Sequence, residues 1–336
     1  MHLAYPSHVV NTSALLGVPV VEDGLARLEP ALLDSVTSGD GFFDQVTTHL
    51  IKSGGKRLRP ALAIAAATGC VRKATEQDVL GAVSVELVHQ ASLYHDDVID
   101  EAMMRRQVES VNNRWGNLVA IVAGDFLLAR SAEIAASLGQ EVASLLANTL
   151  ARLCSGQLVE IRSKFSLERT ESDYFEAISG KTSALMATAC RVGAITSCRP
   201  RDEVETLTRF GSAFGMVFQI RDDILDVIGT EKELGKPVGQ DLAEGVYTLP
   251  VLLALADETS GPLLRRILGR PLEADEVDEA RGVVSSSGAM DATMAIGQRF
   301  AEEAEREAKG ASTPELARAL SDLARTFLDD LVVPAP

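Results

Sequence analysis

Aromatic residues and cysteines are scarce in this 336-residue sequence. Phe, Trp and Tyr together make up 4% of it. Ala and Leu dominate the apolar residues, which favours helices, because strands prefer β-branched and aromatic residues. The cysteines show no C-x-x-C spacing, which argues against the common zinc and dithiol motifs. We expect reduced, mostly buried thiols, as in a cytoplasmic protein, at all four positions: Cys70, Cys154, Cys190 and Cys198.

Long apolar runs and an excess of basic residues are also missing. The apolar stretch at residues 118–128 is interrupted by Gly124 and Asp125, so we expect no segment to span a bilayer. The first residues lack a basic region followed by an apolar core, so no signal peptide is expected. The formal net charge of −16 argues against a general nucleic-acid-binding protein, because that function usually needs a basic surface.

Apolar residues recur at helical spacing through most of the sequence. Long helices are predicted over residues 77–95, 118–136, 141–165, 172–197 and 202–228. No strand-like alternation persists, and no low-complexity linker separates the helices. We therefore predict an all-α protein, with a flexible N-terminal arm over residues 1–20 and a single helical domain over residues 21–336.

Two acidic clusters with the pattern D-D-x-x-D are the most informative feature that is present. They run from Asp96 to Asp100 and from Asp222 to Asp226. Residues three and four apart share one face of a helix, so each cluster directs several carboxylates the same way. Carboxylates this close need a counter-charge, and Mg²⁺ prefers carboxylate oxygens together with phosphate oxygens. The pattern predicts two helices that hold a metal–diphosphate group between them.

Basic residues accompany both clusters. The segment Gly54–Pro60, GGKRLRP, combines glycines with three cations, which suits phosphate oxygens. Arg105 and Arg106 follow the first cluster and suit either pairing with its carboxylates or binding a phosphate. The GKT sequence at residues 180–182 is predicted to begin a helix, a favourable place for an anion. Two further polar residues precede the clusters on the same helix faces: His89 and Gln219. Each feature alone is more often structural, but the set together indicates a diphosphate site.

Taken in order, these motifs resemble those of trans-isoprenyl diphosphate synthases, specifically long-chain polyprenyl diphosphate synthases of the actinobacterial type. The matching segments are GGKRLRP (54–60), HQASLYHDDVIDEAMMRR (89–106), GKT (180–182), FQIRDDILD (218–226) and GKPVGQDLAEG (235–245). They cover about residues 45–255. The resemblance implies an all-helical bundle around a deep central cavity, dependence on Mg²⁺ and usually a homodimer.

The resemblance also implies a role for each matched residue. Mg²⁺ would be held by Asp96, Asp97, Asp100 and Asp222, with Asp223 and Asp226 as further candidates. The allylic diphosphate would be bound by Arg105, Lys181, Thr182, Gln219 and Lys236. The isopentenyl diphosphate would be bound by Lys56, Arg59, His89 and Arg106. The expected catalytic residues among these are Asp96, Asp97, Asp100, Arg105, Lys181 and Asp222.

The chemistry that this family performs suits these residue types. Cations neutralise the departing diphosphate, so the allylic C–O bond breaks heterolytically and leaves a delocalised carbocation. The double bond of isopentenyl diphosphate attacks that carbocation, and a proton is then lost, for which the released diphosphate is a suitable acceptor. No protein nucleophile is required, and an apolar wall must exclude water.

The residues before the first acidic cluster bear on product length. Ala91 and Ser92 lie five and four residues before Asp96, in the region where the resemblance places the tunnel for the growing chain. Bulky aromatic residues there would stop elongation early. The small residues therefore predict an open tunnel and all-trans products of about C35–C50, as used for quinone side chains. A peripheral membrane contact for product release would accompany such a product.

Two residues depart from the family's pattern, and three other functions compete. Val246 stands where a lysine is frequent, and Gln107 where a glycine is common. The alternatives are a geranylgeranyl (C20) diphosphate synthase, a non-catalytic prenyl-diphosphate-binding subunit of a heteromeric synthase, and a terpene cyclase. Both complete acidic clusters argue against the subunit. The isopentenyl-binding set, including Lys56, Arg59 and His89, argues against the cyclase.

Overall fold

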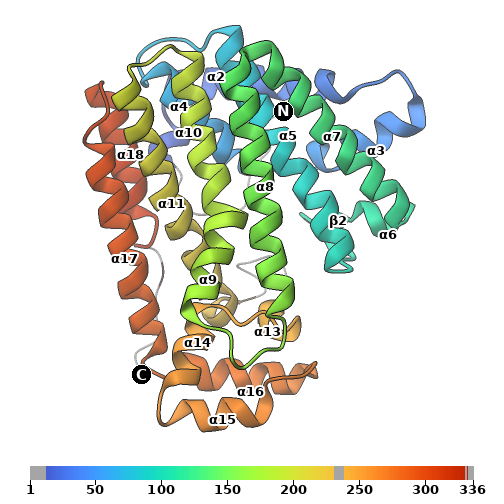
Figure 1. Ribbon diagram of the computed structural model, residues 1–336, viewed down its shortest axis with the longest axis vertical. Helices are drawn as coiled ribbons and strands as arrows, with labels where there is room; N and C mark the ends of the chain where they lie inside the picture. Colours follow the sequence, from blue (N-terminus) through green and yellow to red (C-terminus); the bar gives the residue numbers. More distant parts are fainter. Residues whose placement is uncertain (1–12, 231–237, 330, 332–336) are drawn as a thin grey trace.

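The computed structural model describes residues 13–230, 238–329 and 331, and within them nearly all regular structure is helical (Figure 1). The first helices are α1 (Ser13–Leu16), α2 (Pro19–Val36), α3 (Gly41–Lys52), α4 (Leu58–Thr68), α5 (Glu76–Ile99) and α6 (Val111–Trp115). The middle of the chain forms α7 (Asn117–Leu138), α8 (Gln140–Arg162), α9 (Glu171–Ile178), the π-helical η1 (Ser179–Ser183), α10 (Ala184–Thr196) and α11 (Arg201–Ile228). The C-terminal helices are α13 (Gln240–Ala243), α14 (Leu249–Ala256), α15 (Ser260–Ile267), α16 (Ala274–Ser285), α17 (Ala289–Ala308) and α18 (Pro314–Thr326). The predicted all-α class is confirmed.

The long helices run side by side as a bundle, with α15 and α16 lying across its lower end (Figure 1). Helix α5 is central and begins with a capping box between Thr75 and Asp78, which satisfies backbone N–H groups at its first turn. Helix α7 packs antiparallel on α5, because His95 lies 3.3 Å from the carbonyl of Ile121 and Ser131 donates to the carbonyl of Ser84 at 2.7 Å. This pairing places the end of α5, which carries the first acidic cluster, beside the beginning of α7.

The five predicted helices are all present, although some of their limits differ. Helix α8 ends at Arg162 rather than at residue 165, and Phe165 has a left-handed backbone with φ 60°. The flexible arm predicted over residues 1–20 does not extend to residue 20, because part of this segment is helical. Residues 13–16 already form α1, and Leu15 is fully buried, so the packed bundle begins before residue 21.

The prediction that GKT begins a helix is wrong. Residues 179–183 form a π-helical turn inside a helical run that continues from α9 into α10. Gly180 marks close helix packing instead of a boundary, because a Cβ atom there would lie 2.7 Å from the carbonyl oxygen of Arg152 in α8. Lys181 and Thr182 therefore owe their position to a widened turn in mid-helix, a feature frequent at functional sites.

A small hairpin is the one exception to the helices in the described chain. Its strands are β1 (Met104–Arg105) and β2 (Val108–Glu109), paired antiparallel with Arg105 opposite Val108. Arg106 and Gln107 form the two-residue turn with φ 52° and 64°, the left-handed backbone that such turns require. This conformation explains why glycine would suit position 107, and it turns Arg106 back toward the bundle.

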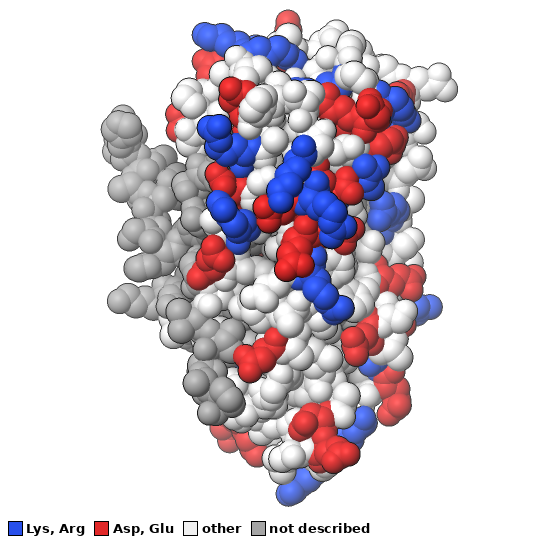
Figure 2. Space-filling model, turned by 90° about the vertical axis from the view of Figure 1, so that its left-hand side faces the viewer, with Lys and Arg blue, Asp and Glu red and all other residues white. Residues whose placement is uncertain are grey.

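The surface of the bundle is charged, and two of the cysteines lie on it. Figure 2 shows basic and acidic side chains interspersed on the face that carries α17 and α18, where Arg209 pairs with Glu307 at 2.9 Å. All four cysteines are free, but Cys154 and Cys198 are exposed, so the expectation of mostly buried thiols holds only for the other two. Within the described ranges, no helix is long and apolar enough to cross a membrane.

Candidate active site

A small polar pocket of about 130 Å³ lies where the ends of α5 and α8 meet η1 and α11. Its charged and polar lining residues are Asp100, Glu160, Arg169, Tyr174, Lys181, Thr182, Gln219, Asp223, Asp241, Glu244 and Thr248. Val246 is among its few apolar members. The pocket therefore collects three residues that were predicted to bind the allylic diphosphate, Lys181, Thr182 and Gln219, beside acids of both clusters.

The widened turn of η1 connects this pocket to both acidic helices. Lys181 donates to Glu160 of α8 at 2.6 Å, and that carboxylate together with Asp96 raises the pKa of Lys181 despite its burial. Thr182 donates to the side-chain oxygen of Gln219 at 2.7 Å, and Gln219 in turn donates to Asp223 at 2.9 Å. The lysine stays protonated, and the chain of hydrogen bonds fixes the orientation of Gln219.

The first acidic cluster is held by cations rather than left as bare charge. Asp97 is fully buried and accepts from the Arg105 guanidinium at 2.6 and 2.7 Å. Burial raises the pKa of Asp96 to about 6, and the charge of Lys181 opposes that rise. Asp100 is the C-cap residue that follows α5, and it lies 3.5 Å from the ammonium group of Lys164. Arg105 thus pairs with a carboxylate of the cluster, as one of its two predicted roles requires. Because it lies at the rim of the same site, its other predicted role, binding a phosphate, is also compatible with this arrangement.

The second acidic cluster divides into three environments. Asp222 is exposed, whereas Asp223 and Asp226 are buried. Asp223 accepts from the hydroxyl of Tyr174 at 2.5 Å as well as from Gln219. Asp226 accepts from the backbone N–H groups of Gln240 and Asp241, which caps the short helix α13. Asp223 and Asp226 thus have structural partners, and the metal role predicted for all three residues stays a prediction.

A second cationic site lies between α4, α5 and the hairpin. The side-chain nitrogens of Arg59 and His89 are 3.3 Å apart, and the Nε of Arg59 is buried without a hydrogen-bond partner. Arg106 donates to the carbonyls of Leu50 and Gly54. Burial, with the charges of Arg59 and Arg106, holds the pKa of His89 well below its usual value. Neutral His89 beside these arginines makes a strongly positive site suited to an anion.

Arg57 and Gly55 of the GGKRLRP segment adjoin this cationic site and fix the backbone of the segment. Arg57 is buried and pairs with Glu29 at 2.6 Å and with Glu86 at 2.8 Å, so it anchors the segment to the bundle. Gly55 has φ +147°, and a Cβ atom there would lie 2.9 Å from the guanidinium carbon of Arg106. Lys56 is exposed. The structure brings three of the four predicted isopentenyl-site residues together: Arg59, His89 and Arg106.

An apolar groove of about 550 Å³ leads away from the polar pocket between α5, α7 and α8. Its apolar lining consists of Val98, Ile99, Ile121, Leu128, Leu150, Leu153, Leu158 and Ile161. Ser92, Asp96 and Lys181 also line it, and Lys181 is shared with the polar pocket. Ala91 is fully buried in the core and Ser92 faces the groove.

The donor atoms suit a hard divalent cation, although the described residues alone do not complete a site. The Oδ2 atom of Asp97 is buried without a hydrogen-bond partner, and Asp100 and Glu160 each contribute to raising the pKa of Asp96, so the cluster favours added positive charge. Among the residues that the structure describes, no group of three acids, histidines or cysteines converges closely enough to hold a metal.

Several residues of the site were assigned no role in the analysis of the sequence. Glu160, Lys164, Arg169, Tyr174 and Glu244 all contact or line the polar pocket. They lie on α8, α9 and two connections, and only tertiary packing brings them to the acidic clusters. Lys236, predicted to bind the allylic diphosphate, lies outside the described residues.

The chain is similar to a known protein family and to several characterised proteins and structures. Residues 41–284 match the family described as polyprenyl synthetase. The chain is 37% identical to heptaprenyl diphosphate synthase component 2 of Geobacillus stearothermophilus over 90% of this chain and 95% of that protein. It is 39% identical to nonaprenyl diphosphate synthase of Mycobacterium tuberculosis over 85% and 86% of the two chains. A crystal structure of polyprenyl synthase from Caulobacter crescentus, complexed with calcium and isoprenyl diphosphate, superposes with a TM-score of 0.87 at 30% identity and covers 95% of this chain and 98% of that one.

The buried carboxyl of Asp223 predicts how stability depends on pH in the metal-free protein. Burial raises the pKa of Asp223 to about 7, above the value of about 3.9 for an unfolded chain. The folded state therefore holds a proton that the unfolded state has lost, and this contribution to stability disappears as the pH rises through 7. We expect the free energy of unfolding to fall between pH 5 and pH 8, and to fall less in Asp223→Asn.

Urea unfolding in EDTA at several pH values measures this difference. Asp291→Asn is the matched control, because Asp291 is exposed on α17 and its loss should leave the slope unchanged. Equal slopes in the wild type and in Asp223→Asn would show that Asp223 is already ionised at pH 5.

Proposed function

Since the chain belongs to the polyprenyl synthetase family and is a prenyltransferase, we propose that it makes all-trans polyprenyl diphosphates by successive head-to-tail condensation. Isopentenyl diphosphate is the repeating unit and an allylic diphosphate is the primer. The product is about C35–C50, of the kind used for quinone side chains. The heptaprenyl and nonaprenyl names of the two relatives support a long product.

One observation carries this proposal, namely that Lys181 lines both the small polar pocket and the large apolar groove. A ligand that fills both must have a compact anionic head and a long apolar tail. The polar pocket, at about 130 Å³, is too small and too charged for hydrocarbon. The groove, lined mostly by Ile, Leu and Val, offers few groups for phosphate. A prenyl diphosphate has this shape and this division of charge.

The residues divide the reaction between two neighbouring anion sites. Lys181, Thr182 and Gln219 would hold the allylic diphosphate and keep its head group fixed as the C–O bond breaks. Arg59, His89 and Arg106 would hold isopentenyl diphosphate with its double bond toward the carbocation. The proximity of the two sites is supported by the guanidinium carbon of Arg59, which lies 5.9 Å from the ring centre of Phe218, the residue before Gln219 in α11. The apolar groove keeps water from the carbocation.

The divalent metal is part of the proposal, and Mg²⁺ is the ion we assign. Asp96, Asp97, Asp100 and Asp222 would hold it, with Asp223 and Asp226 as further candidates from the second cluster. When bound, the ion would neutralise the charge that develops on the leaving diphosphate. The calcium ion in the Caulobacter crescentus polyprenyl synthase structure supports a divalent site in this family.

The direct test is an incubation with Mg²⁺, farnesyl diphosphate and labelled isopentenyl diphosphate, followed by chromatographic sizing of the products. We expect a ladder that ends near C35–C50, and a loss of about 100-fold or more in Asp96→Ala, because the leaving group then lacks full charge stabilisation. EDTA should abolish incorporation. A ladder that stops at C20 would assign a geranylgeranyl diphosphate synthase. No incorporation by the wild type would support the non-catalytic subunit instead.

Product length should depend on the wall of the groove at Ser92. The side chain of Ser92 faces the groove, so Ser92→Tyr is expected to fill it and to shorten the final product toward C15–C20. Ala91→Tyr is expected to shorten it as well, but at a cost of about 1–3 kcal/mol in stability, because Ala91 is fully buried in the core. The same chromatographic assay reads the lengths, and Ala292→Tyr on the exposed face of α17 is the control. Unchanged lengths in both variants would place the growing chain elsewhere.

A homodimer is the assembly we propose, formed through α7 and α8. Helix α7 exposes Leu118 and Val122 outside the groove, and the exposed Ile121, Leu158 and Ile161 belong to the adjoining wall of the groove. A helix that is apolar on all sides is normally buried, and α7 lacks such cover on its outer face. A second copy would bury this surface beside the groove.

Light scattering tests the dimer through a paired substitution. Leu118→Glu with Val122→Glu is expected to give a monomeric mass, because two charges would then be desolvated in the interface. Leu263→Glu is the matched control, since Leu263 is an exposed leucine on α15, away from α7 and α8. A wild type that is monomeric at micromolar concentration would contradict the proposed assembly.

Two further parts of the proposal concern where the reaction takes place. We place it in the cytoplasm, where charged isoprenyl diphosphates are available in water. A long polyprenyl tail is poorly soluble, so we include a peripheral membrane contact through which the product leaves. Co-sedimentation with lipid vesicles, with and without product bound, tests this contact, and no sedimentation in either state would contradict it.

A further inference from the structure

The connection between α8 and α9 carries a lysine that no motif of the sequence marks. Lys164 follows the last turn of α8, and its ammonium group lies 3.5 Å from Oδ1 of Asp100, the final acid of the first cluster. Its side chain is 24% exposed, whereas that of Lys309 on α17 is 67% exposed. Lys164 is thus directed into the site rather than into solvent.

The backbone around Lys164 is fixed to the wall of the polar pocket. The N–H of Phe165 donates to the carbonyl of Gly245 at 2.8 Å, and Arg169 donates to the carbonyl of Tyr247 at 3.0 Å. These two bonds flank Val246, which lines the pocket. The connection and the segment that carries Val246 therefore form one unit.

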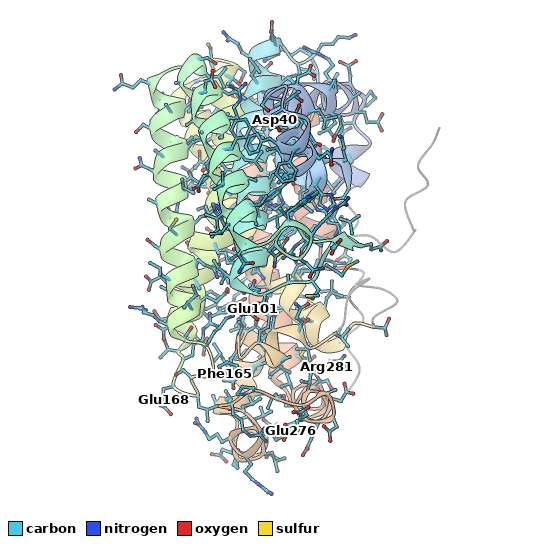
Figure 3. The ribbon with its side chains drawn as sticks, turned by 90° about the vertical axis from the view of Figure 1, so that its right-hand side faces the viewer. Asp40, Glu101, Phe165, Glu168, Glu276 and Arg281 are labelled. Carbon is cyan, nitrogen blue, oxygen red and sulfur yellow. The ribbon has the colours of Figure 1, made fainter. Side chains whose placement is uncertain are left out.

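The packing of Phe165 against Gly245 fixes the backbone of the α8–α9 connection relative to the segment that carries Val246. Phe165 has a left-handed backbone with φ 60°, a conformation that costs free energy for an aromatic residue. Gly245 has φ +73°, and a Cβ atom there would lie 2.4 Å from the Phe165 ring. Figure 3 shows Phe165 at the end of α8, at the same end of the bundle as Glu101, which follows α5. The strained residue next to Lys164 thus sets the position of the lysine beside Asp100.

The charges around the pocket explain what such a lysine could bind. Lys181 is paired with Glu160, and Asp100 and Glu244 contribute two further carboxylates to the lining of the polar pocket. Burial and the charge of Asp100 raise the pKa of Glu244, and the charges of Lys164 and Lys181 oppose this rise. Lys164 and Lys181 therefore both contribute positive charge to the small polar pocket. Val246, where the family frequently has a lysine, adds no charge.

We propose that Lys164 is a further binding residue for the diphosphate of the allylic substrate, acting together with Lys181. This inference rests on the proposed function. On binding, the ammonium group would exchange its single long contact with Asp100 for phosphate oxygens, while Asp100 is released toward the metal. The chain thereby recovers, from the α8–α9 connection, a cation that the apolar residue at position 246 does not supply.

Steady-state kinetics at saturating Mg²⁺ test the assignment with Lys164→Met, which keeps the length of the side chain and removes its charge. We expect the KM for farnesyl diphosphate to rise about ten-fold, as for the loss of a charge-assisted hydrogen bond, and the KM for isopentenyl diphosphate to stay within two-fold. Lys164→Arg should restore most of the affinity. Lys309→Met is the matched control for removing a surface lysine.

A rescue experiment separates a direct contact from a structural role. Adding Val246→Lys to Lys164→Met places an ammonium group in the same pocket and should recover part of the affinity for farnesyl diphosphate. Equal changes in both KM values, or a rise in the KM for farnesyl diphosphate that appears only below saturating Mg²⁺, would overturn the proposal in favour of a role through Asp100.

Direct binding keeps this test separate from the proposed function. Calorimetry with Mg²⁺ and inorganic diphosphate needs no turnover, and Lys164→Met should bind about ten-fold more weakly than the wild type. If the wild type makes no product but this difference remains, the proposed function fails and the role of Lys164 stands. Equal binding by both proteins, or no binding by the wild type, overturns the role of Lys164.

Discussion

The placement of several carboxylates at the end of α5 is the constraint on which the rest of the site depends. Buried carboxylates are costly unless cations or hydrogen-bond donors accompany them. Arg105 accompanies Asp97, and Lys164 lies beside Asp100. Lys181, paired with Glu160, is the main charge that opposes the raised pKa of Asp96. Each of these cations comes from a different element. The hairpin, the π-helical turn and the α8–α9 connection therefore all meet at the end of α5.

The same constraint accounts for the division of the cavity. Cations and acids gather at the ends of α5 and α8, whereas the adjoining faces of α5, α7 and α8 are apolar. Farther along, Ser131 donates to the carbonyl of Ser84, which holds α7 against α5 beyond the groove. A ligand is thus positioned by its charged head while its tail meets only hydrocarbon. Each condensation releases the allylic diphosphate, and the lengthened chain keeps the diphosphate of isopentenyl diphosphate. Repeated condensation then requires that diphosphate to move into the allylic site while the tail extends along the groove.

The sequence alone predicts the fold class, the long helices and most of the site. Apolar residues that favour helices mark α5, α7, α8 and α11, and the acidic and basic motifs lie within or beside these helices. What it misses depends on tertiary contacts. Gly180 looks like a helix boundary, but it permits α8 to approach η1. Lys164 and Glu160 belong to no motif, because only the packing of α8 against α5 and η1 brings them to the acidic clusters. Ala91 and Ser92 are adjacent in sequence, yet only Ser92 lines the groove.

The central claim is that one ligand occupies the polar pocket and the apolar groove together. A crystal structure with Mg²⁺ and an unreactive thiolo analogue of farnesyl diphosphate tests it most directly. We expect phosphate oxygens within hydrogen-bonding distance of Lys181, metal density between the phosphates and the acidic clusters, and the farnesyl tail between α5, α7 and α8 beside Ser92. A diphosphate bound away from Lys181, or a tail outside this groove, would contradict it.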